Sequence, residues 1–363
     1  MSDTLTPVER VDTVLRGGIP DRVAVDLHNF LMTAHASGLP YPEYFQNGEA
    51  MAEGHLKAWR EFGHDVLVLE NGTAALAQAC GCEVDYLPDS APVTVGPAIR
   101  SLDELDKLLM PNPYTAHPLV ENLKLTRIVV RETRQQAFIM GRADQGPFSL
   151  ASMLLGLEAF LMALSDPDCR DKLHRLLEFS LEVVYRYAIA QMEQGAHVTS
   201  IGESLSGPDV CSPKMYKEFE WGYAKRLVER LQEKNIRMAY HICGNATRIV
   251  NDMTATGASI LELDYKCDLP KIKAATLGKT TILGVIDPSD VLALGTSELV
   301  ASKVREELDI LAPGGGLILG PGCALPPLTP AENIHTLIET AHRYGRYRAD
   351  GTLDIGAKLT RLD

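Results

Sequence analysis

Residues 236–264 read IRMAYHICGNATRIVNDMTATGASILELD, in which two apolar runs, 236–243 and 259–264, flank a helical segment that starts after a glycine and an asparagine. This arrangement is typical of neighbouring strands in a parallel sheet that helices cover. Six further runs of this kind occur in the chain: RVAVDL (22–27), DVLVLE (65–70), AFIMGR (137–142), HVTSIGE (197–203), TILGVID (281–287) and LILGPG (317–322). Eight such strands predict an α/β fold, a closed (β/α)8 TIM barrel, whose functional groups gather at the carboxyl ends of its strands. A doubly wound open sheet is the alternative, but no G-x-G-x-x-G follows the first strand to favour it.

One segment fits the barrel pattern less well than the rest of the chain. Residues 71–136 contain ACGCEVDYLPDSAPVTVGP (79–97) and PNPYTAHPL (111–119), and we expect an inserted lobe there. No linker divides the chain, so we expect a single barrel domain over residues 1–363. The residues Thr6–Glu9 have the pattern of a capping box with proline at the first helical position, which predicts the first helix.

The composition restricts the classes of partner. With 363 residues, 45% of them hydrophobic, the chain suits one large barrel. A net charge of −13 offers no basic face to nucleic acid or to an anionic membrane, so we expect neither as a partner. The stretch MSDTLTPVERVDTVLRGG is polar where a secretory signal is apolar, and no window approaches the length of a membrane span. Seven cysteines without an export signal indicate reduced thiols, and we expect a cytoplasmic protein.

Three residues offer metal ligands at the carboxyl ends of two predicted strands. His241 and Cys243 are two residues apart at the end of the fifth strand, so their side chains point to the same side. Cys323 lies in a turn rich in glycine and proline after the eighth strand. One imidazole and two thiolates suit tetrahedral zinc with a fourth position open to substrate, although buried free cysteines are also common as core residues. The remaining cysteines are expected to be structural: Cys80, Cys82, Cys169, Cys211 and Cys267.

The C-terminal third resembles a known protein family. HICGNATRIVNDMTATGASILELDYKCDLPKIKAAT, TILGVIDPSDVLALGT and LGPGCALPPLTPAENI are similar to the uroporphyrinogen decarboxylase superfamily, as are TPVERVDTVLRGGIPDRVAV and GRADQGPFSLASMLLG nearer the N-terminus. Within the superfamily the chain resembles the zinc-dependent corrinoid methyltransferases of the methylcobamide:coenzyme M type. This resemblance implies that His241, Cys243 and Cys323 bind Zn²⁺.

The resemblance also implies an activity. The enzyme is expected to move a methyl group between a corrinoid such as methylcobalamin, carried by a separate corrinoid protein, and a small thiol such as coenzyme M or a small methyl donor. One alternative is an O-demethylase component that transfers methyl from an aryl methyl ether to Co(I) corrinoid. An alternative of another class is a non-enzymatic zinc- or corrinoid-binding barrel. The sequence Asp26-Leu27-His28 begins the corrinoid-binding pattern D-x-H-x-x-G, but Leu31 stands where the glycine is required, so the corrinoid is expected on the partner.

Decarboxylation of uroporphyrinogen is disfavoured. The decarboxylase holds a substrate with eight carboxylates by arginines near its N-terminus, and this chain has no arginine between Arg22 and Arg60. Its aspartate for the pyrrole nitrogens falls near Gly72, and its last histidine and a late asparagine correspond to Cys323 and Val285.

Other polar residues at strand ends complete the predicted site. Glu203 ends the fourth strand, beside the fifth in barrel order, and is the candidate catalytic residue and fourth zinc ligand, with capping of a helix as the alternative. Asp264 and Asp287 are expected to orient His241 or contact substrate, although Asp287 also fits the start of a helix. His28 and Glu70 are expected to line the substrate pocket. The substrate-binding candidates are thus four residues: His28, Glu70, Asp264 and Asp287.

Overall fold

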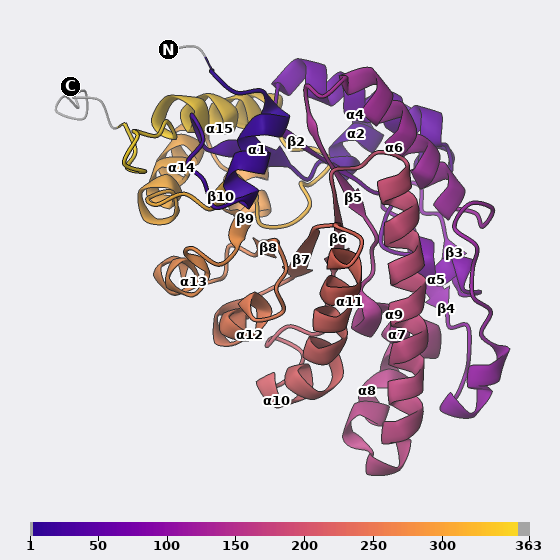
Figure 1. Ribbon diagram of the computed structural model, residues 1–363. Helices are drawn as coiled ribbons and strands as arrows, with labels where there is room; N and C mark the ends of the chain where they lie inside the picture. The colour runs from indigo at the N-terminus through magenta and orange to yellow at the C-terminus, as the bar shows by residue number, and fades with distance from the viewer. Residues whose placement is uncertain (1–2, 355–363) are drawn as a thin grey trace.

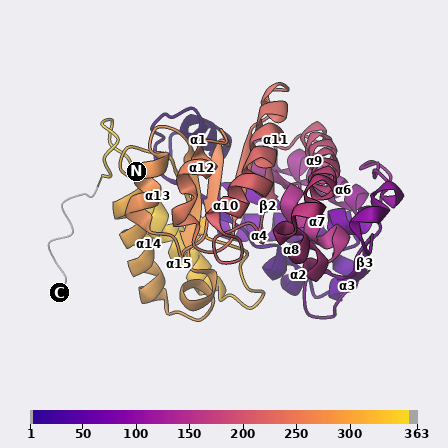
Figure 2. The ribbon, with the colours of Figure 1, turned by 90° about the horizontal axis from the view of Figure 1, so that it is seen from below.

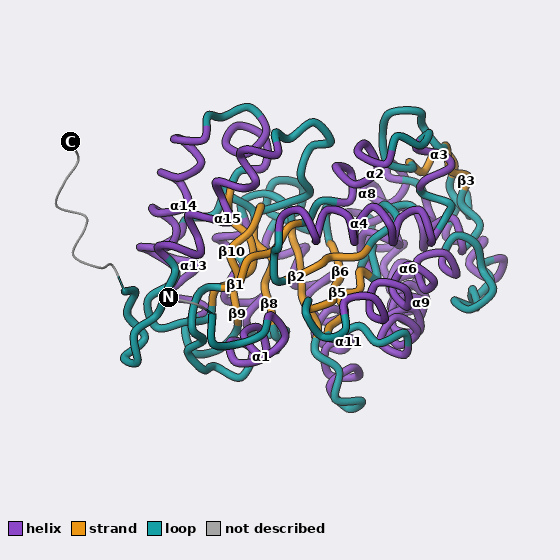
Figure 3. Tube along the Cα trace, turned by 90° about the horizontal axis from the view of Figure 1, so that it is seen from above, coloured by secondary structure: helices purple, strands orange, loops and turns teal. Residues whose placement is uncertain are grey.

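All eight predicted strands are present and close into one parallel barrel. The computed structural model describes residues 3–354, and the strands lie at its centre with helices around them (Figures 1 and 3). Neighbouring strands follow the order β1-β10-β9-β8-β7-β6-β5-β2, and β2 pairs with β1 to close the ring. The barrel strands are β1 (Ala24–Leu27), β2 (Val66–Leu69), β5 (Phe138–Arg142), β6 (Val198–Gly202), β7 (Met238–Ile242), β8 (Ile260–Leu263), β9 (Thr281–Ile286) and β10 (Leu317–Pro321).

Helices connect consecutive strands and cover the outside of the barrel. The α-helices are α1 (Pro7–Leu15), α2 (Phe30–Ser37), α3 (Tyr41–Tyr44), α4 (Gly48–Phe62), α5 (Ala75–Ala79), α6 (Leu119–Thr133), α7 (Pro147–Leu155), α8 (Leu157–Ser165), α9 (Arg170–Glu193), α10 (Pro213–Tyr216), α11 (Gly222–Gln232), α12 (Val250–Thr254), α13 (Leu269–Thr276), α14 (Ser297–Leu311) and α15 (Ala331–Tyr344). Short 3-10 turns are η1 (Leu102–Lys107), η2 (Pro167–Cys169) and η4 (Ala246–Arg248), and π-helical turns are η3 (Lys217–Trp221) and η5 (Pro288–Ala293).

The predicted lobe occupies the first part of its predicted range. β3 (Glu83–Asp85) and β4 (Val93–Gly96) form a separate antiparallel pair, on the side of the molecule opposite α13–α15 (Figures 1 and 2). In contrast, α6 belongs to the barrel itself, because its Leu125 and Val129 share a buried cluster with Leu67 of β2. The segment 71–136 therefore contains the lobe followed by a barrel helix.

Helix α1 covers the N-terminal end of the barrel. It begins with the predicted capping box, in which the Thr6 hydroxyl accepts from the backbone N–H of Glu9 and the Glu9 carboxylate accepts from the N–H of Thr6. Val11 on its inner face is fully buried in the cluster that fills the barrel interior, with Val8 and Leu15 packed against that cluster.

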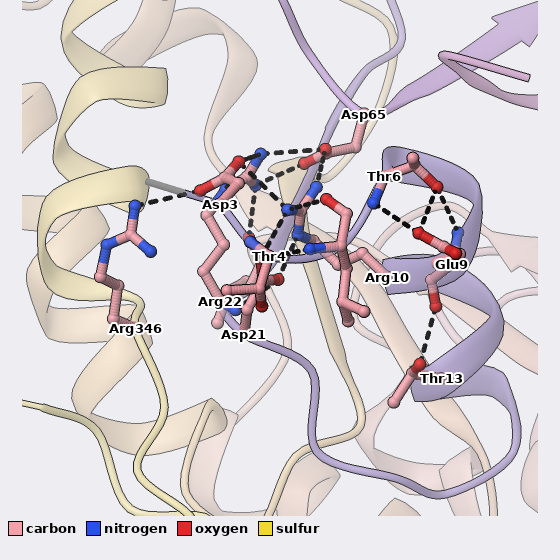
Figure 4. A network of polar contacts seen from close by, with 12 residues as sticks. Asp3, Thr4, Thr6, Glu9, Arg10, Thr13, Asp21, Arg22, Asp65 and Arg346 are labelled. Carbon is pink, nitrogen blue, oxygen red and sulfur yellow. Dashed lines mark hydrogen bonds and ion pairs between the residues drawn. The ribbon is translucent and has the colours of Figure 1, made fainter. Parts of the chain in front are cut away.

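A buried charge network joins α1 to this end of the barrel (Figure 4). Asp65, which precedes β2 and is fully buried, lies 2.7 Å from Nη1 of Arg10 and 2.6 Å from Nη1 of Arg22. Arg10 Nε also donates to Asp21 at 2.7 Å, and Arg22 pairs with Asp3 at 2.9 Å. Because this network lies at the N-terminal end, its role is to hold α1 and β1 to the barrel rather than to serve the site.

Within residues 3–354, no single helix is both long and apolar enough to cross a membrane. Only α7 and α8 taken together reach that length and composition, and they bend by 113° where they meet.

Candidate metal centre at the barrel mouth

The inward-facing side chains change from apolar to polar toward the carboxyl ends of the strands. At one level the barrel is filled by Ala24, Val68, Met140, Ala239 and Ile260. Two residues further along each strand, where the side chain again points inward, stand Asp26, Glu70, Arg142, His241 and Glu262. These five, with His28 and Asp144 beside them, are called the polar layer, and none is more than 5% exposed.

The three predicted metal ligands converge above this layer. His241 is on β7, Cys243 follows that strand, and Cys323 follows β10. One ligand atom from each lies within 4.8 Å of the other two, and His241 Nε2 is 3.0 Å from Cys243 Sγ. Because β8 and β9 separate β7 from β10 in the sheet, this convergence depends on the curvature of the closed barrel.

Backbone contacts fix the orientation of His241. Its Nδ1 donates to the backbone carbonyl of Glu262 at 3.0 Å, and a carbonyl can only accept. In the neutral ring the proton is therefore on Nδ1, and the lone pair of Nε2 faces the two sulfur atoms. The orienting group is thus a carbonyl of β8 and not Asp264 or Asp287, the predicted candidates.

Asp264 instead fixes the turn that carries Cys243. Its carboxylate accepts from the backbone N–H groups of Gly244 at 2.8 Å and Lys266 at 3.0 Å. Gly244 has φ +80°, and a Cβ there would collide with the Asp209 carboxylate, so this position requires glycine. Asp264 and the glycine at position 244 therefore fix the backbone that directly follows Cys243.

The glutamate predicted as fourth ligand points away from this centre. Glu203 is fully buried, and its carboxylate accepts from the N–H groups of Phe148 at 2.9 Å and Ser149 at 2.7 Å, which cap the start of α7. The reason is strand alternation, since Val198 lies in the barrel interior and Ile201 lies in the outer shell, and Glu203 follows the parity of Ile201. Metal ligation by Glu203 would require it to give up both cap hydrogen bonds, and that role stays a prediction.

Asp287 also acts as a cap. Its side chain accepts from the N–H groups of Ser289 at 2.8 Å and Asp290 at 3.0 Å, at the start of η5. This is the helix-start alternative, and it occupies the carboxylate that was expected to face the site.

His28 and Glu70 belong to the polar layer. His28 Nε2 is 2.8 Å from Glu70 Oε2, and His28 Nδ1 is 3.4 Å from Glu262 Oε1. Burial lowers the pKa of His28, but the two carboxylates outweigh it and leave the pKa well above its ordinary value. Contact of His28 or Glu70 with substrate stays a prediction.

Several members of the polar layer were not predicted from the sequence as site residues. Arg142 Nη1 donates to Glu262 Oε2 at 2.6 Å, while its Nε is 3.5 Å from Glu70 and 3.9 Å from Asp144. Burial raises the pKa of Asp26 to about 8 and that of Asp144 to about 6. A signal was available, because a charged residue inside an apolar strand, as in RVAVDL, AFIMGR and SILELD, must find a buried partner.

A large pocket lies beside this centre but contains none of its ligands. The cavity of about 550 Å³ is bounded by α2, α4 and residues 327–331, with Asn29 at its inner edge. None of the three predicted metal ligands is part of its wall, so we assign no metal chemistry to this cavity.

Comparison with known proteins confirms the resemblance seen in the sequence. Methylcobamide:CoM methyltransferase MtbA of Methanosarcina mazei is 27% identical over 348 residues, covering 93% of this chain and 98% of the relative. A uroporphyrinogen decarboxylase of Thermus thermophilus is 28% identical over 302 residues, covering 82% and 85%. A solved methyltransferase from Methanosarcina mazei superposes with a TM-score of 0.85 at 25% identity, covering 93% of this chain and 99% of that chain. The sequence profile of one family, uroporphyrinogen decarboxylase (URO-D), matches residues 6–344, and the chain therefore belongs to that family.

Proposed function

We propose that this protein is a zinc-dependent methyltransferase that moves a methyl group between a corrinoid on a separate protein and a small molecule. The observation that carries the proposal is the convergence of His241, Cys243 and Cys323 at the mouth of the barrel. The names of the methylcobamide:CoM methyltransferases among its relatives support the same activity.

The donor set fits zinc. Tetrahedral zinc with bonds of about 2.3 Å to sulfur and about 2.0 Å to nitrogen separates its ligand atoms by about 3.5–3.8 Å. The three ligand atoms already lie within 4.8 Å of one another, so small side-chain rotations suffice. Among residues 3–354 no fourth His, Cys, Asp or Glu joins this group, which favours a site that keeps a position for substrate over a closed structural site.

The residues around the predicted metal ligands fix the orientation of those ligands. Zinc bound there supplies Lewis acidity, which keeps a thiol substrate in its thiolate form or stabilises the oxygen that leaves a methyl ether. The Glu262 carbonyl holds His241 in the tautomer that presents Nε2, and Asp264 fixes the turn after Cys243. The metal ligands thus need little reorganisation on binding.

Decarboxylation of uroporphyrinogen is disfavoured by the same geometry. A substrate with eight carboxylates needs several cationic partners, but the one guanidinium of the polar layer, Arg142, is already paired with Glu262. The resemblance to the superfamily also implies that Cys323 stands where the decarboxylase has a histidine. The likeness to the decarboxylases at 28% identity is therefore attributed to the shared fold and family.

Metal analysis tests the centre directly. Mass spectrometry of the purified protein is expected to find about one zinc per chain, and Cys243→Ser and Cys323→Ser are each expected to lose it. Cys169→Ser is the matched control, because Cys169 lies in η2 outside the group and should retain zinc. Zinc that persists in Cys323→Ser would refute the centre.

Activity assays separate the alternatives. Methylation of a thiol by free methylcobalamin would establish transfer from corrinoid to thiol. Methylation of Co(I)alamin by a guaiacol-like ether would instead establish the O-demethylase component. Bound zinc without transfer in either direction, with any corrinoid, would favour the non-enzymatic barrel.

A further inference from the structure

The polar layer carries more negative than positive groups. Four carboxylates, those of Asp26, Glu70, Asp144 and Glu262, face one guanidinium and the imidazole of His28, while the second imidazole of the layer, His241, is turned to the proposed metal site. All are buried, so water does not screen them as it does surface charges. Even with both cations charged and Asp26 protonated, the three remaining carboxylates outnumber the cations.

The one guanidinium of the polar layer, that of Arg142, is already paired with carboxylates. Arg142 lies within 3.9 Å of three carboxylates, with the shortest contact, 2.6 Å, to Glu262. The other buried arginines among residues 3–354, Arg10 and Arg22, belong to the network at the opposite end of the barrel. Lys266 lies near the mouth but is exposed to solvent.

In the described part of the chain, the hydrogen-bonding groups of this region left without partners are mostly acceptors. Both oxygens of Asp26, Oε1 of Glu262 and Oε1 of Gln145 are buried and unpartnered. Of the unpartnered donors, Arg142 Nε and His28 Nδ1 already face Glu70 and Glu262, and Asn29 Nδ2 belongs to a residue that lines the neighbouring cavity. Burial, with a smaller contribution from the nearby Glu262 carboxylate, raises the pKa of Asp26 to about 8. An additional buried anion would find no cation that is not already paired with a carboxylate, and burying such a charge is costly.

We propose that the barrel mouth selects a small substrate with a neutral or cationic tail and discriminates against an anionic tail such as a sulfonate. This inference rests on the proposed function, because it concerns the molecule whose sulfur or oxygen reaches the metal. It separates this chain from the coenzyme M enzymes named among its relatives, since coenzyme M carries a sulfonate. Glu70 and Asp144 are the specificity-determining residues. Their carboxylates lie beside Arg142 and neutralise the guanidinium that a sulfonate would need.

Three thiols with the same two-carbon chain test the proposal. Cysteamine, 2-mercaptoethanol and 2-mercaptoethanesulfonate differ in the charge of the tail, and their Kd values are read from the thiolate absorption bands of the cobalt(II)-substituted protein. The sulfonate is expected to bind at least about tenfold more weakly than 2-mercaptoethanol. Equal or tighter binding of the sulfonate would overturn the proposal.

Two variants identify the source of the selectivity. Glu70→Gln and Asp144→Asn each remove one charge with little change of shape, and each is expected to bring the sulfonate Kd about tenfold closer to that of 2-mercaptoethanol. A merely structural role would weaken all three thiols equally and leave the ratio unchanged, which would contradict the assignment. Asp106→Asn, which removes a charge from a side chain that is 94% exposed, is the control and should not move the ratio.

Turnover is measured separately. With free methylcobalamin, transfer breaks the cobalt–carbon bond, leaves its electron pair on cobalt as Co(I), forms the carbon–sulfur bond and releases the thiol proton. If no thiol is methylated although the order of Kd values holds, transfer to thiols fails while the selectivity stands. If the sulfonate is methylated with the highest kcat/KM, the selectivity is wrong and the methyltransferase function is established.

Discussion

Single residues hold the two ends of the barrel in different ways. At the N-terminal end, Asp65 is placed between two arginines and also accepts from the N–H of Val25 at 2.8 Å. At the carboxyl end, Gly244 allows the backbone to turn closely past Asp209 after the proposed metal ligand Cys243. The first arrangement supports stability, whereas the second supports the geometry of the site.

Asp65→Asn is expected to lower the free energy of unfolding by about 3 kcal/mol or more, because it removes the fully buried carboxylate that Arg10 and Arg22 share and leaves them only the more exposed carboxylates of Asp21 and Asp3. Urea denaturation followed by circular dichroism measures this loss. Asp12→Asn is the control, since Asp12 forms half-exposed ion pairs and should change stability by less than about 1 kcal/mol. Equal effects of the two changes would contradict the structural role of the network.

Gly244→Ala is expected to reduce zinc affinity by about tenfold or more, because alanine disfavours the positive φ and its Cβ meets the Asp209 carboxylate. Competition with a chromogenic chelator measures the affinity. Adding Asp209→Ala should restore part of it, since the collision is removed while the backbone strain remains. Unchanged affinity in Gly244→Ala would show that the turn does not position Cys243.

At the scale of elements, strands were easier to predict than the orientation of the residues at their ends. Eight apolar runs specified eight barrel strands because burial on both faces requires continuous apolar sequence. The pair His241 and Cys243 was found because both point inward, whereas the position of Glu203 after β6 turns its side chain outward onto α7. Arg142 and Glu262 were missed because their pairing joins β5 to β8, a contact that sequence spacing does not reveal.

The π-helical turn η3 carries a buried glutamate whose charge is expected to affect stability. Burial and the nearby Glu203 carboxylate raise the pKa of Glu220 well above its ordinary value of 4.5. Within residues 3–354, only one of its oxygens has a partner, the Tyr240 hydroxyl at 2.7 Å. The folded protein therefore keeps a proton that the unfolded chain loses above about pH 4.5, and this group lowers stability as pH rises.

Glu220→Gln is expected to stabilise the protein at pH 8 by roughly 1–3 kcal/mol and to have little effect at about pH 4.5. Urea titrations at a series of pH values between these limits measure the difference from the unmodified protein. Glu218→Gln on the same turn is the control, because Glu218 is half-buried and paired with Arg170. A gain that does not grow with pH would contradict the buried protonated state.

At the scale of the whole molecule, the proposed metal centre connects parts of the chain that the sheet keeps apart. Its ligands come from β7 and β10, which are not neighbours in the barrel. Zinc that binds only the folded state stabilises it by mass action. We therefore expect added zinc to raise the Tm of the metal-free protein and to leave the Tm of Cys323→Ser nearly unchanged, as measured by scanning calorimetry. An equal rise in both would show that the ion does not join the two strands.

The placement of Cys323 has a consequence for the growing chain on the ribosome. The first two ligands are synthesised about eighty residues before the third, at a stage when β8, β9 and β10 do not yet exist and the ring is open. At protein synthesis rates of about 5–20 residues per second, several seconds pass in which only half a site is available. An interrupted or prematurely released chain would never acquire the third ligand. We therefore expect tight zinc binding at the proposed centre only once β10 has paired with β1 and the barrel is complete.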